Sequence, residues 1–450
     1  MRPVHLPIPF LLFVVLGCSA PERRPLAPDE LMTSLREQRE LLLEVGPYAP
    51  ETTPDSEGGA EAGARVLPLD QAMTLAVVHN PDLQRLRSLV GVAEARLVEA
   101  GLLPDPSFGW DAMDWVVGGT RDDAVTGLSA FLPLLRPGER SARLALSEAD
   151  LEGVRARVAE AEWRVAGEVQ DAWLLAWSLE RRLATARELE GIAARTAAAV
   201  EQGRALGGAT ALEVEAALLE AGQARALVYE LEREAERARL RLCSLLGLPP
   251  DTAFRLPDPP ALVLDGAAVE QPAALVDRAL ASRPDVQVAM TDYRRAEEAL
   301  QLVAAGRWPS LTIGTGFEVT LPILSRFAGP AMRTAEARRR SVALALVATL
   351  ASLRVQARDV VAELAAARRT WELNRDVLTP AALRALEAGG RALELGGATV
   401  LEILVVQRRA LEARLQAEES HERLLRAEAR LRWFLGRTSE SALVPLSAQD

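Results

Sequence analysis

The sequence of 450 residues contains no lysine, so all 52 basic residues are arginine. Aromatic residues make up only 4% of the chain, and there are just two cysteines and three histidines. Two cysteines cannot form a disulfide framework or a thiolate metal cluster, and neither His79 nor His421 has a second ligand at metal-binding spacing. The net charge of −11 argues against binding the phosphate backbone of a nucleic acid. We therefore expect no metal, no cofactor and no nucleic-acid partner.

Catalytic motifs are also missing from the sequence. It contains no Gly-rich phosphate loop and no G-x-S-x-G segment. A lipoprotein enzyme therefore finds no support, and we predict that the chain is not an enzyme. The residues that dominate instead are Ala, Leu, Arg and Glu, a mixture that is typical of long packed helices.

The N-terminus has the pattern of a secretory signal peptide, with Arg2, an apolar run from Ile8 to Leu16, and small residues after it. The run is too short to cross a bilayer as a helix. Val15-Leu16-Gly17-Cys18 resembles a bacterial lipobox, which implies that residues 1–17 are removed and that Cys18 is lipidated; the alternative is an ordinary signal peptide with an incidental cysteine. By resemblance to the sorting rule for lipoproteins, Ser19 favours the outer membrane. Residues 18–65, with one helix candidate near Asp29–Val45, are predicted to be a tether.

Five landmarks recur in the same order in the two halves of the chain, which indicates a duplication. Two recur 203 residues later: Asn80-Pro81-Asp82 as Arg283-Pro284-Asp285, and Pro106-Ser107-Phe108 as Pro309-Ser310-Leu311. Three recur 189 residues later: Leu132-Pro133-Leu134 as Leu321-Pro322-Ile323, Leu206–Glu213 as Leu395–Glu402, and Leu246-Gly247 as Leu435-Gly436. The second copy is therefore 14 residues shorter (203 minus 189), all of them lost between Pro309 and Pro322. We predict repeats at 66–248 and 272–436, a Pro-rich connector at 249–271 and a tail at 437–450.

Each repeat is predicted to contain the same parts. A helix of about 30 residues leads to a short β segment, at 106–133 in the first copy and 309–322 in the second. A very long helix follows, at about Glu139–Gly203 and Pro330–Gly390, and a Gly-Gly turn leads into a returning helix of about 35 residues. At 1.5 Å per residue, the long helices would reach roughly 90–100 Å.

The long helices carry apolar residues at alternating spacings of three and four, which is the pattern of a coiled coil. An ordinary bundle core would also give an apolar stripe, but the helix length and the duplication favour a barrel of helices. The two predicted seams are Val165, Val169, Ala172, Ala176, Leu179, Leu183 and Ala186 in the first copy, and Leu350, Leu353, Ala357, Val360, Leu364, Ala367 and Trp371 in the second.

Taken in order, these features resemble the TolC/CusC-type outer-membrane efflux family, over about Leu67 to Gly436. Asn80-Pro81-Asp82-Leu83 looks like the family's NPDL segment, Pro309-Ser310-Leu311 like its PSL, and Pro133–Arg140 like its exit from the strands. The resemblance implies a mainly α fold of duplicated long helical hairpins. Three protomers would form a coiled-coil α-barrel across the periplasm, capped by a β-barrel in the outer membrane.

The tip of each hairpin carries the candidate functional residues. The family has a Gly, five residues and an Asp at this turn; this chain has Gly207 with Glu213 and Gly396 with Glu402. The resemblance implies an acidic constriction at the periplasmic mouth, which would repel anions and bind cations. An acid in the first helical turn also favours the positive end of the helix dipole, so the two interpretations are compatible. Leu206-Gly207 and Leu395-Gly396 resemble the motif that meets a periplasmic adaptor.

The β segments depart from the family pattern because they are short. A transmembrane strand needs about 9–11 residues, whereas only Ser310 to Leu321 lie between the landmark prolines of the second copy. We therefore predict a small, truncated β-hairpin region with strands of about five residues in the second copy. Trp110, Trp115 and Phe131 would lie at the membrane interface or in subunit contacts.

The predicted function is a lipoprotein conduit of a tripartite efflux or export system. It would form a homotrimer, dock a periplasmic adaptor (membrane fusion) protein and an inner-membrane pump, and be anchored to outer-membrane lipid through Cys18, with most of its mass in the periplasm. The alternative is a non-conducting α-barrel or coiled-coil spacer or docking lipoprotein.

Overall fold

The computed structural model describes residues 65–111, 127–259, 272–314, 317–323, 328–395 and 397–436. Cys18, the predicted tether up to residue 64, Trp115 and the predicted tail lie outside these ranges, and so does Gly396. The first repeat contains α3 (Leu69–His79), α4 (Pro81–Gly101), β2 (Ser107–Asp111), β3 (Gly127–Leu134), α5 (Glu139–Ala205) and α6 (Ala211–Leu246). The second contains α8 (Pro272–Ser282), α9 (Pro284–Ala305), β5 (Ser310–Gly314), β6 (Phe317–Thr320), α10 (Gly329–Leu373), η2 (Asn374–Leu378), α11 (Thr379–Glu394) and α12 (Val400–Phe434).

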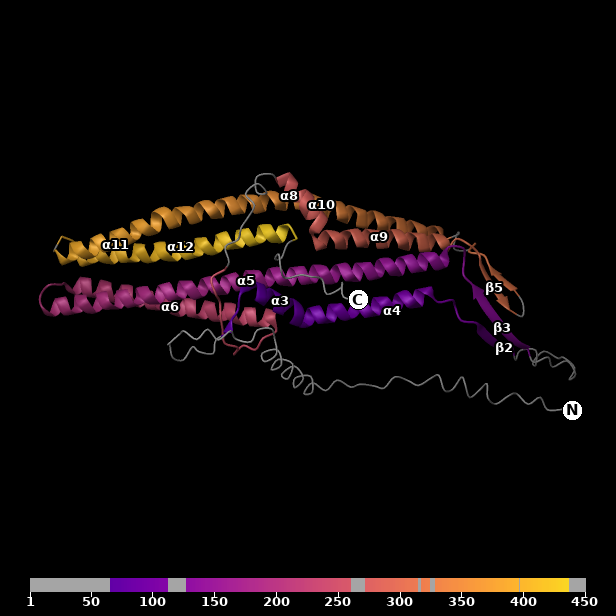
Figure 1. Ribbon diagram of the computed structural model, residues 1–450, viewed down its shortest axis with the longest axis horizontal. Helices are drawn as coiled ribbons and strands as arrows, with labels where there is room; N and C mark the ends of the chain where they lie inside the picture. The colour runs from indigo at the N-terminus through magenta and orange to yellow at the C-terminus, as the bar shows by residue number, and fades with distance from the viewer. Residues whose placement is uncertain are drawn as a thin grey trace, which may run out of the picture. The chain divides into compact units, whose positions relative to one another are not determined.

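The two repeats have the same arrangement of helices (Figure 1). In the first, α4 and α6 follow one another along the long helix α5, which has 67 residues and is roughly 100 Å long. In the second, α9 and α12 follow one another along α10 and α11. The repeats meet where α9 and α12 pack against α5. Two short strands, β1 (Arg65–Val66) and β4 (Phe254–Arg255), form a separate sheet.

The predicted helices of about 30 residues are each broken in two, which corrects the sequence prediction. The breaks fall at Asn80 and Arg283, immediately before Pro81 and Pro284, because a proline disfavours the helical conformation of the residue that precedes it. Asn80 then caps α4, accepting hydrogen bonds from the backbone N–H groups of Asp82 (2.9 Å) and Leu83 (3.3 Å).

Arg283, the counterpart of Asn80, has a different role. It makes no cap; its side chain is buried, with the residue only 2% exposed, and donates to both carboxylate oxygens of Asp285, at 2.9 and 2.6 Å. Its guanidinium lies 5.2–5.4 Å from the ring centres of Trp163, Trp433 and Phe434. The arginine therefore joins α5 of the first repeat to α9 and α12 of the second.

The long helix predicted at Pro330–Gly390 is also interrupted, by the π-helical turn η2 just before Pro380. Pro380 has no N–H to donate and its ring crowds the carbonyl one turn earlier, so the local helix widens. The N–H of Thr379 accordingly bonds to the carbonyl of Asn374, five residues back. The chain then continues as α11 to Glu394.

Both predicted coiled-coil seams are confirmed. Six of the seven residues of the first seam are buried in the apolar core that α3, α5 and α6 share, and Leu183 packs against this core. In the second seam, Leu353, Ala357 and Leu364 are buried in the core of α8, α9, α10 and α12, and the other four residues are partly buried against it. Cys243, predicted to be a small core residue, is 2% exposed in the first core. The alanines in both seams let the long helices approach closely, so the core between these helices is thin.

One face of α10 has no partner in the described part of the chain. Leu344, Val347 and Val355 lie on that face and are 63%, 60% and 70% exposed. By length and composition alone, the helical run Gly329–Ala392 contains a stretch apolar enough to cross a membrane, and only 11% of that stretch is buried. An apolar face of this extent indicates a contact with another molecule.

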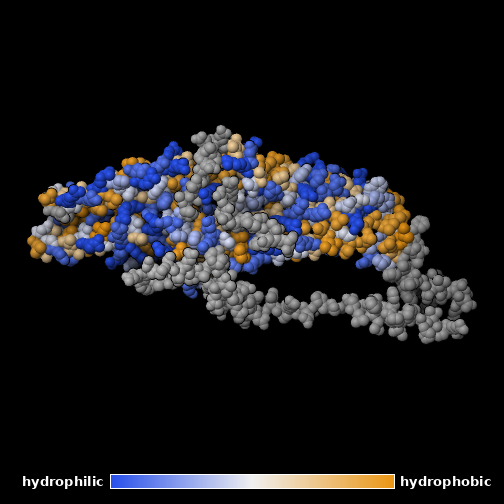
Figure 2. Space-filling model, viewed as in Figure 1, coloured by the Kyte–Doolittle hydropathy of each residue, from blue (hydrophilic) through white to orange (hydrophobic). Residues whose placement is uncertain are grey.

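The second sheet has four antiparallel strands in the order β2-β3-β5-β6, so the strands of both repeats join into one sheet. Its strands are short: β5 has five residues and β6 has four, as predicted for the second copy. Figure 2 shows apolar surface gathered near this end of the helices and again at the hairpin tips.

Candidate functional site

The two hairpin tips place the predicted leucines in solvent. Leu206 is 89% exposed and Leu395 is 87% exposed, at the turns that follow α5 and α11. Gly207 has a φ of +79°, a left-handed conformation that a side chain would strain, which explains the glycine in this turn. Each tip therefore presents one large apolar side chain on a tightly turned backbone, a geometry suited to contact with another protein.

The predicted acids are held by their own helix starts. The carboxylate of Glu213 accepts hydrogen bonds from the backbone N–H and the hydroxyl of Thr210, both at 2.8 Å, and the Thr210 hydroxyl accepts from the N–H of Glu213. Glu402 and Thr399 repeat this arrangement, with carboxylate contacts of 2.8 and 3.0 Å. Both pairs are capping boxes.

These hydrogen bonds keep the tip acids ionised. The backbone N–H and then the hydroxyl of the threonine lower the pKa of Glu213 and of Glu402 below the ordinary value of a glutamate. The geometry therefore shows that both acids stabilise the starts of their own helices. The negative charges still lie at the solvent-exposed tips, so the predicted acidic constriction stays a hypothesis.

The two tips belong to hairpins that contact each other. Val400 and Leu404 of α12 pack into the same apolar cluster as Val200 and Val214 of the first hairpin. Arg408 forms an ion pair with Glu220 across this contact. Ala216, three residues after Glu213, packs against this cluster.

At the opposite end, the four-stranded sheet has one apolar face. Directly paired residues share a face, and the pairs Leu132–Ile313 and Leu134–Leu311 put four apolar side chains on it, with Val319 opposite Leu311. Leu132, Leu134, Ile313 and Val319 are 40–50% exposed. The other face carries Ser310, Thr312, Glu318 and Thr320 beside Phe131 and Pro133. A sheet with one exposed apolar face suits contact with lipid.

Long helical hairpins can form a barrel of helices or an ordinary bundle, and comparison with known proteins distinguishes the two. Residues 73–248 match the sequence model of a family described as outer membrane efflux protein. This part of the chain is therefore similar to the outer membrane efflux protein family. The match covers α3 to α6, that is, almost the whole first repeat, and the second repeat has the same parts.

A curated relative of the outer membrane efflux family is the pyoverdine export outer membrane protein OpmQ of Pseudomonas putida, 28% identical over 271 residues. The alignment covers 55% of this chain and 56% of that protein, so the chain matches little more than half of its curated relative.

Solved structures show the fold over most of the chain. A membrane protein from Pseudomonas aeruginosa aligns with a TM-score of 0.70 at 21% identity, covering 84% of this chain and 92% of that one. The outer membrane protein VceC of Vibrio cholerae aligns with a TM-score of 0.69 at 18% identity, covering 82% and 96%. The predicted fold class, duplicated TolC-like helical hairpins with short strands, is confirmed.

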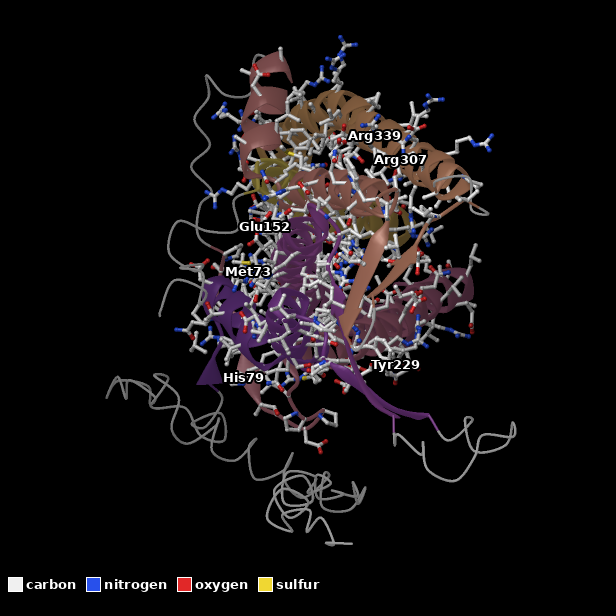
Figure 3. The ribbon with its side chains drawn as sticks, turned by 90° about the vertical axis from the view of Figure 1, so that its right-hand side faces the viewer. Met73, His79, Glu152, Tyr229, Arg307 and Arg339 are labelled. Carbon is white, nitrogen blue, oxygen red and sulfur yellow. The ribbon has the colours of Figure 1, made fainter. Side chains whose placement is uncertain are left out.

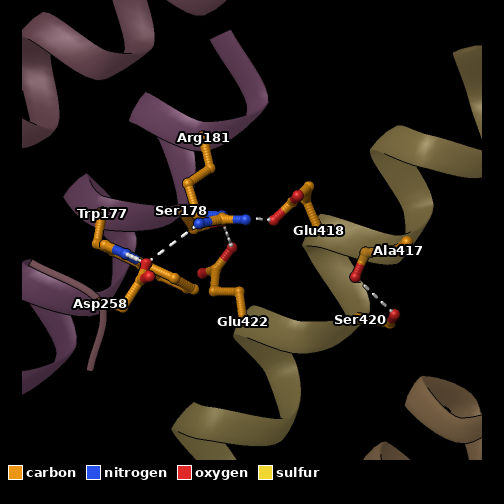
Figure 4. Close-up of polar contacts among 8 residues, drawn as sticks. All are labelled: Trp177, Ser178, Arg181, Asp258, Ala417, Glu418, Ser420 and Glu422. Carbon is orange, nitrogen blue, oxygen red and sulfur yellow. Dashed lines mark hydrogen bonds and ion pairs between the residues drawn. The ribbon is translucent and has the colours of Figure 1, made fainter. Parts of the chain in front are cut away.

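Sequence reasoning missed a polar contact between the two repeats (Figure 4). Arg181 of α5 bridges Asp258 of the connector, at 3.1 Å, and Glu418 of α12, at 3.0 Å. Beside it, the hydroxyl of Ser178 donates to the buried carboxylate of Glu422, at 2.9 Å. These bonds raise the pKa of Arg181, Glu418 contributing most. The contact fixes the relative position of the two hairpins.

An aromatic stack continues this polar contact. His421 of α12 lies parallel to Trp371, with ring centres 4.5 Å apart, and edge-on to Trp177 at 5.5 Å. The three residues come from α5, α10 and α12, so only the folded chain brings them together. Trp371 on the second predicted seam was the available sequence signal, but it did not indicate His421 as its partner.

Proposed function

We propose that this chain is the outer-membrane-associated conduit of an efflux or export system, formed by three copies of the chain. The observation that carries the proposal is the pair of long hairpins in the fold of outer-membrane efflux channels. One protomer supplies two hairpins, which cannot enclose a pore. The apolar face of α10 around Leu344, Val347 and Val355 supports an assembly in which neighbouring copies cover it.

In this proposal the hairpin tips dock a periplasmic adaptor, which links the conduit to an inner-membrane pump. Leu206 and Leu395 offer apolar anchors that a partner could bury, and the capping boxes keep the two turns rigid. Glu213 and Glu402, ionised at the same tips, would make the narrow mouth selective for cations.

At the other end, the sheet and a lipid would attach the tube to the outer membrane. A five-residue strand spans roughly 17 Å, about half of a hydrocarbon layer of about 30 Å. The apolar face of the sheet suits shallow insertion, with a lipid on Cys18 contributing the remaining attachment. In this proposal, most of the chain would lie in the periplasm.

A second candidate function is a spacer or docking lipoprotein that does not conduct. The observation that favours it is the length of β5 and β6, five and four residues, because unpaired backbone groups are costly inside a hydrocarbon layer. Conduction separates the two candidates, since both keep the helical hairpins and the tips.

The experiment is planar-bilayer conductance of the purified full chain. The conduit predicts discrete conductance steps with a preference for cations. Replacing both tip acids, Glu213→Gln with Glu402→Gln, should reduce this preference, while Glu336→Gln on exposed α10 should leave it unchanged. Discrete steps that are indifferent to the tip substitutions would overturn the acidic constriction but not the conduit. A bilayer that stays silent would favour the spacer.

A further inference from the structure

The contact between the repeats in Figure 4 ties three segments of the chain together. Arg181 of α5 pairs with Glu418 of α12 and with Asp258 of the connector. The indole N–H of Trp177 also donates to Asp258, at 3.3 Å, and the Arg181 guanidinium lies 5.4 Å from the centre of that ring. One arginine therefore neutralises two carboxylates from different segments. Together with His421, these four residues form what we call the clasp.

His421 of α12 completes the clasp by joining a third helix to it. Its ring stacks on Trp371 of α10, with ring centres 4.5 Å apart, and meets Trp177 of α5 edge-on at 5.5 Å. On the α10 side, the guanidinium of Arg375 lies 5.8 Å from the centre of the Trp371 ring and is itself paired with Asp376. The imidazole is thus held between two indole rings that belong to different repeats.

Three charged side chains of the clasp act on the imidazole of His421. Glu418, nearly one turn earlier on α12, and Asp258 of the connector favour its protonated form, whereas Arg181 of α5 disfavours it. Burial has the largest effect, and it lowers the pKa of His421 below the ordinary value of a histidine. The closed clasp therefore holds the neutral imidazole more favourably than an open one does.

Two other ion pairs between the hairpins lie nearer the tips and contain no histidine. Arg414 pairs with Glu188 at 2.7 Å, and Arg408 pairs with Glu220. Of the side chains in these contacts and in the clasp, only histidine has an ordinary pKa between about pH 5 and pH 8. A proton taken up in this range can therefore act on the clasp and leave the contacts near the tips in place.

We propose that the clasp is a proton-sensitive device: protonation of His421 loosens the contact between the two hairpins near the middle of α5, while the contacts nearer the tips stay closed. A charged imidazolium loses much of its hydration between the two indole rings, and it competes with Arg181 for Glu418 and Asp258. The arginine then holds α5 less firmly against α12. The device belongs to the protomer, so it operates whether the chain conducts or serves as a spacer.

Hydrogen–deuterium exchange of the full chain in mild detergent, followed by mass spectrometry, measures this opening. Exchange is compared at about pH 7.5 and about pH 5, after correction for the intrinsic pH dependence of amide exchange. Peptides around His421 and Arg181 should lose protection about threefold or more at the lower pH, whereas peptides around Arg408 and Glu220 should keep theirs. Unchanged protection around His421 would overturn the proposal, and so would an equal loss in both regions.

Charge variants separate the proton from the ion pair. Arg181→Gln removes a charge that opposes protonation of the closed clasp, so the loss of protection at low pH should be smaller than in the unmodified chain. Glu418→Gln removes a charge that favours protonation, so the loss should be larger. Both variants break the same ion pair, so a contact without a proton switch would respond equally to both. An equal response would therefore contradict the device.

Histidine variants locate the proton. His421→Gln cannot take up the proton, so protection around residue 421 should no longer change with pH. His79, at the end of α3 (Figure 3), is the other histidine in the described part of the chain, and His79→Gln should leave the change around His421 in place. A pH dependence that persists in His421→Gln would overturn the assignment. If that variant does not fold, the opposite effects of Arg181→Gln and Glu418→Gln decide.

Discussion

The sequence did not predict the surroundings of His421. These surroundings change the pKa of its side chain, and the change can be tested. Burial between Trp371 and Trp177 lowers its pKa, and Arg181 acts in the same direction; Glu418 and Asp258 oppose them. A histidine with a lowered pKa in the fold binds its proton more readily when unfolded. Its contribution to stability is therefore complete above the unfolded pKa of about 6.5 and is lost as the pH falls towards the folded value.

We predict that His421→Gln reduces the pH dependence of thermal stability as the pH falls below about 6.5. Chemical or thermal melts of the variant and the unmodified chain over this range measure the effect. His79, whose pKa burial also lowers, provides the comparison, since His79→Gln should leave the His421 part of the slope in place. Identical slopes for all three chains would contradict the assignment.

Cys18 carries the second prediction at this scale. Replacing Cys18 with Ser should abolish incorporation of labelled fatty acid and remove the chain from the outer-membrane fraction, because the thioether-forming group is lost. Cys243→Ser is the matched control: Cys243 is the other cysteine, it lies in the core of α6, and its loss should leave the label in place. A Cys18→Ser chain that still fractionates with the outer membrane would contradict lipid anchoring.

At the scale of helices, two glycines give opposite expectations for the same substitution. Gly167 lies where a Cβ would meet Trp433 at 2.7 Å, whereas Gly222 in α6 has nothing within 4 Å. Gly167→Ala should destabilise the fold by about 1–3 kcal/mol, since it separates Trp433 from Trp163, on which its ring stacks at 3.9 Å. Gly222→Ala should stabilise it by up to about 1 kcal/mol through helix propensity. Denaturant titration measures both, and equal effects would contradict the packing between α5 and α12.

The helices also show how far sequence reasoning reached. Periodicity predicted both seams, since the spacing of residues such as Val165 and Leu353 depends only on the local helix. Duplication predicted the position of β5 and β6. The breaks at Asn80 and Arg283 were missed although Pro81 and Pro284 mark them, because proline at the first helical position is also compatible with one continuous apolar pattern. The turn η2 was missed because a proline can either kink or widen a helix.

The candidate sites also differ in whether the sequence could predict them. The tips could be found because Leu206 and Glu213 lie within one short motif that repeats at Leu395 and Glu402. The contact between Arg181 and Glu418 could not, since 237 residues separate them and only the packing of the repeats brings them together. The clasp at His421 likewise depends on three helices from two repeats, and no local pattern marks it.

At the scale of the whole molecule, the account depends on assembly. A protomer with two hairpins leaves the apolar face of α10 uncovered and encloses no lumen, whereas three protomers would cover that face and close a tube. The acidic tips, the adaptor contact and the conductance all presuppose this arrangement. Ion pairs such as Arg408 with Glu220 already hold the two hairpins of one protomer together. Assembly of three copies therefore requires contacts only between the outer faces of neighbouring protomers.

Assembly of three copies into a tube is tested most directly on the full chain in mild detergent. Light scattering gives the number of copies in each particle, and electron microscopy of the same sample gives the end-on projection. The account predicts particles of three copies with an opening along their long axis. Substituting Leu344 and Val347 by Glu on the open face of α10 should shift these particles towards monomers. A monomer without an axial opening in the unmodified chain would contradict the conduit.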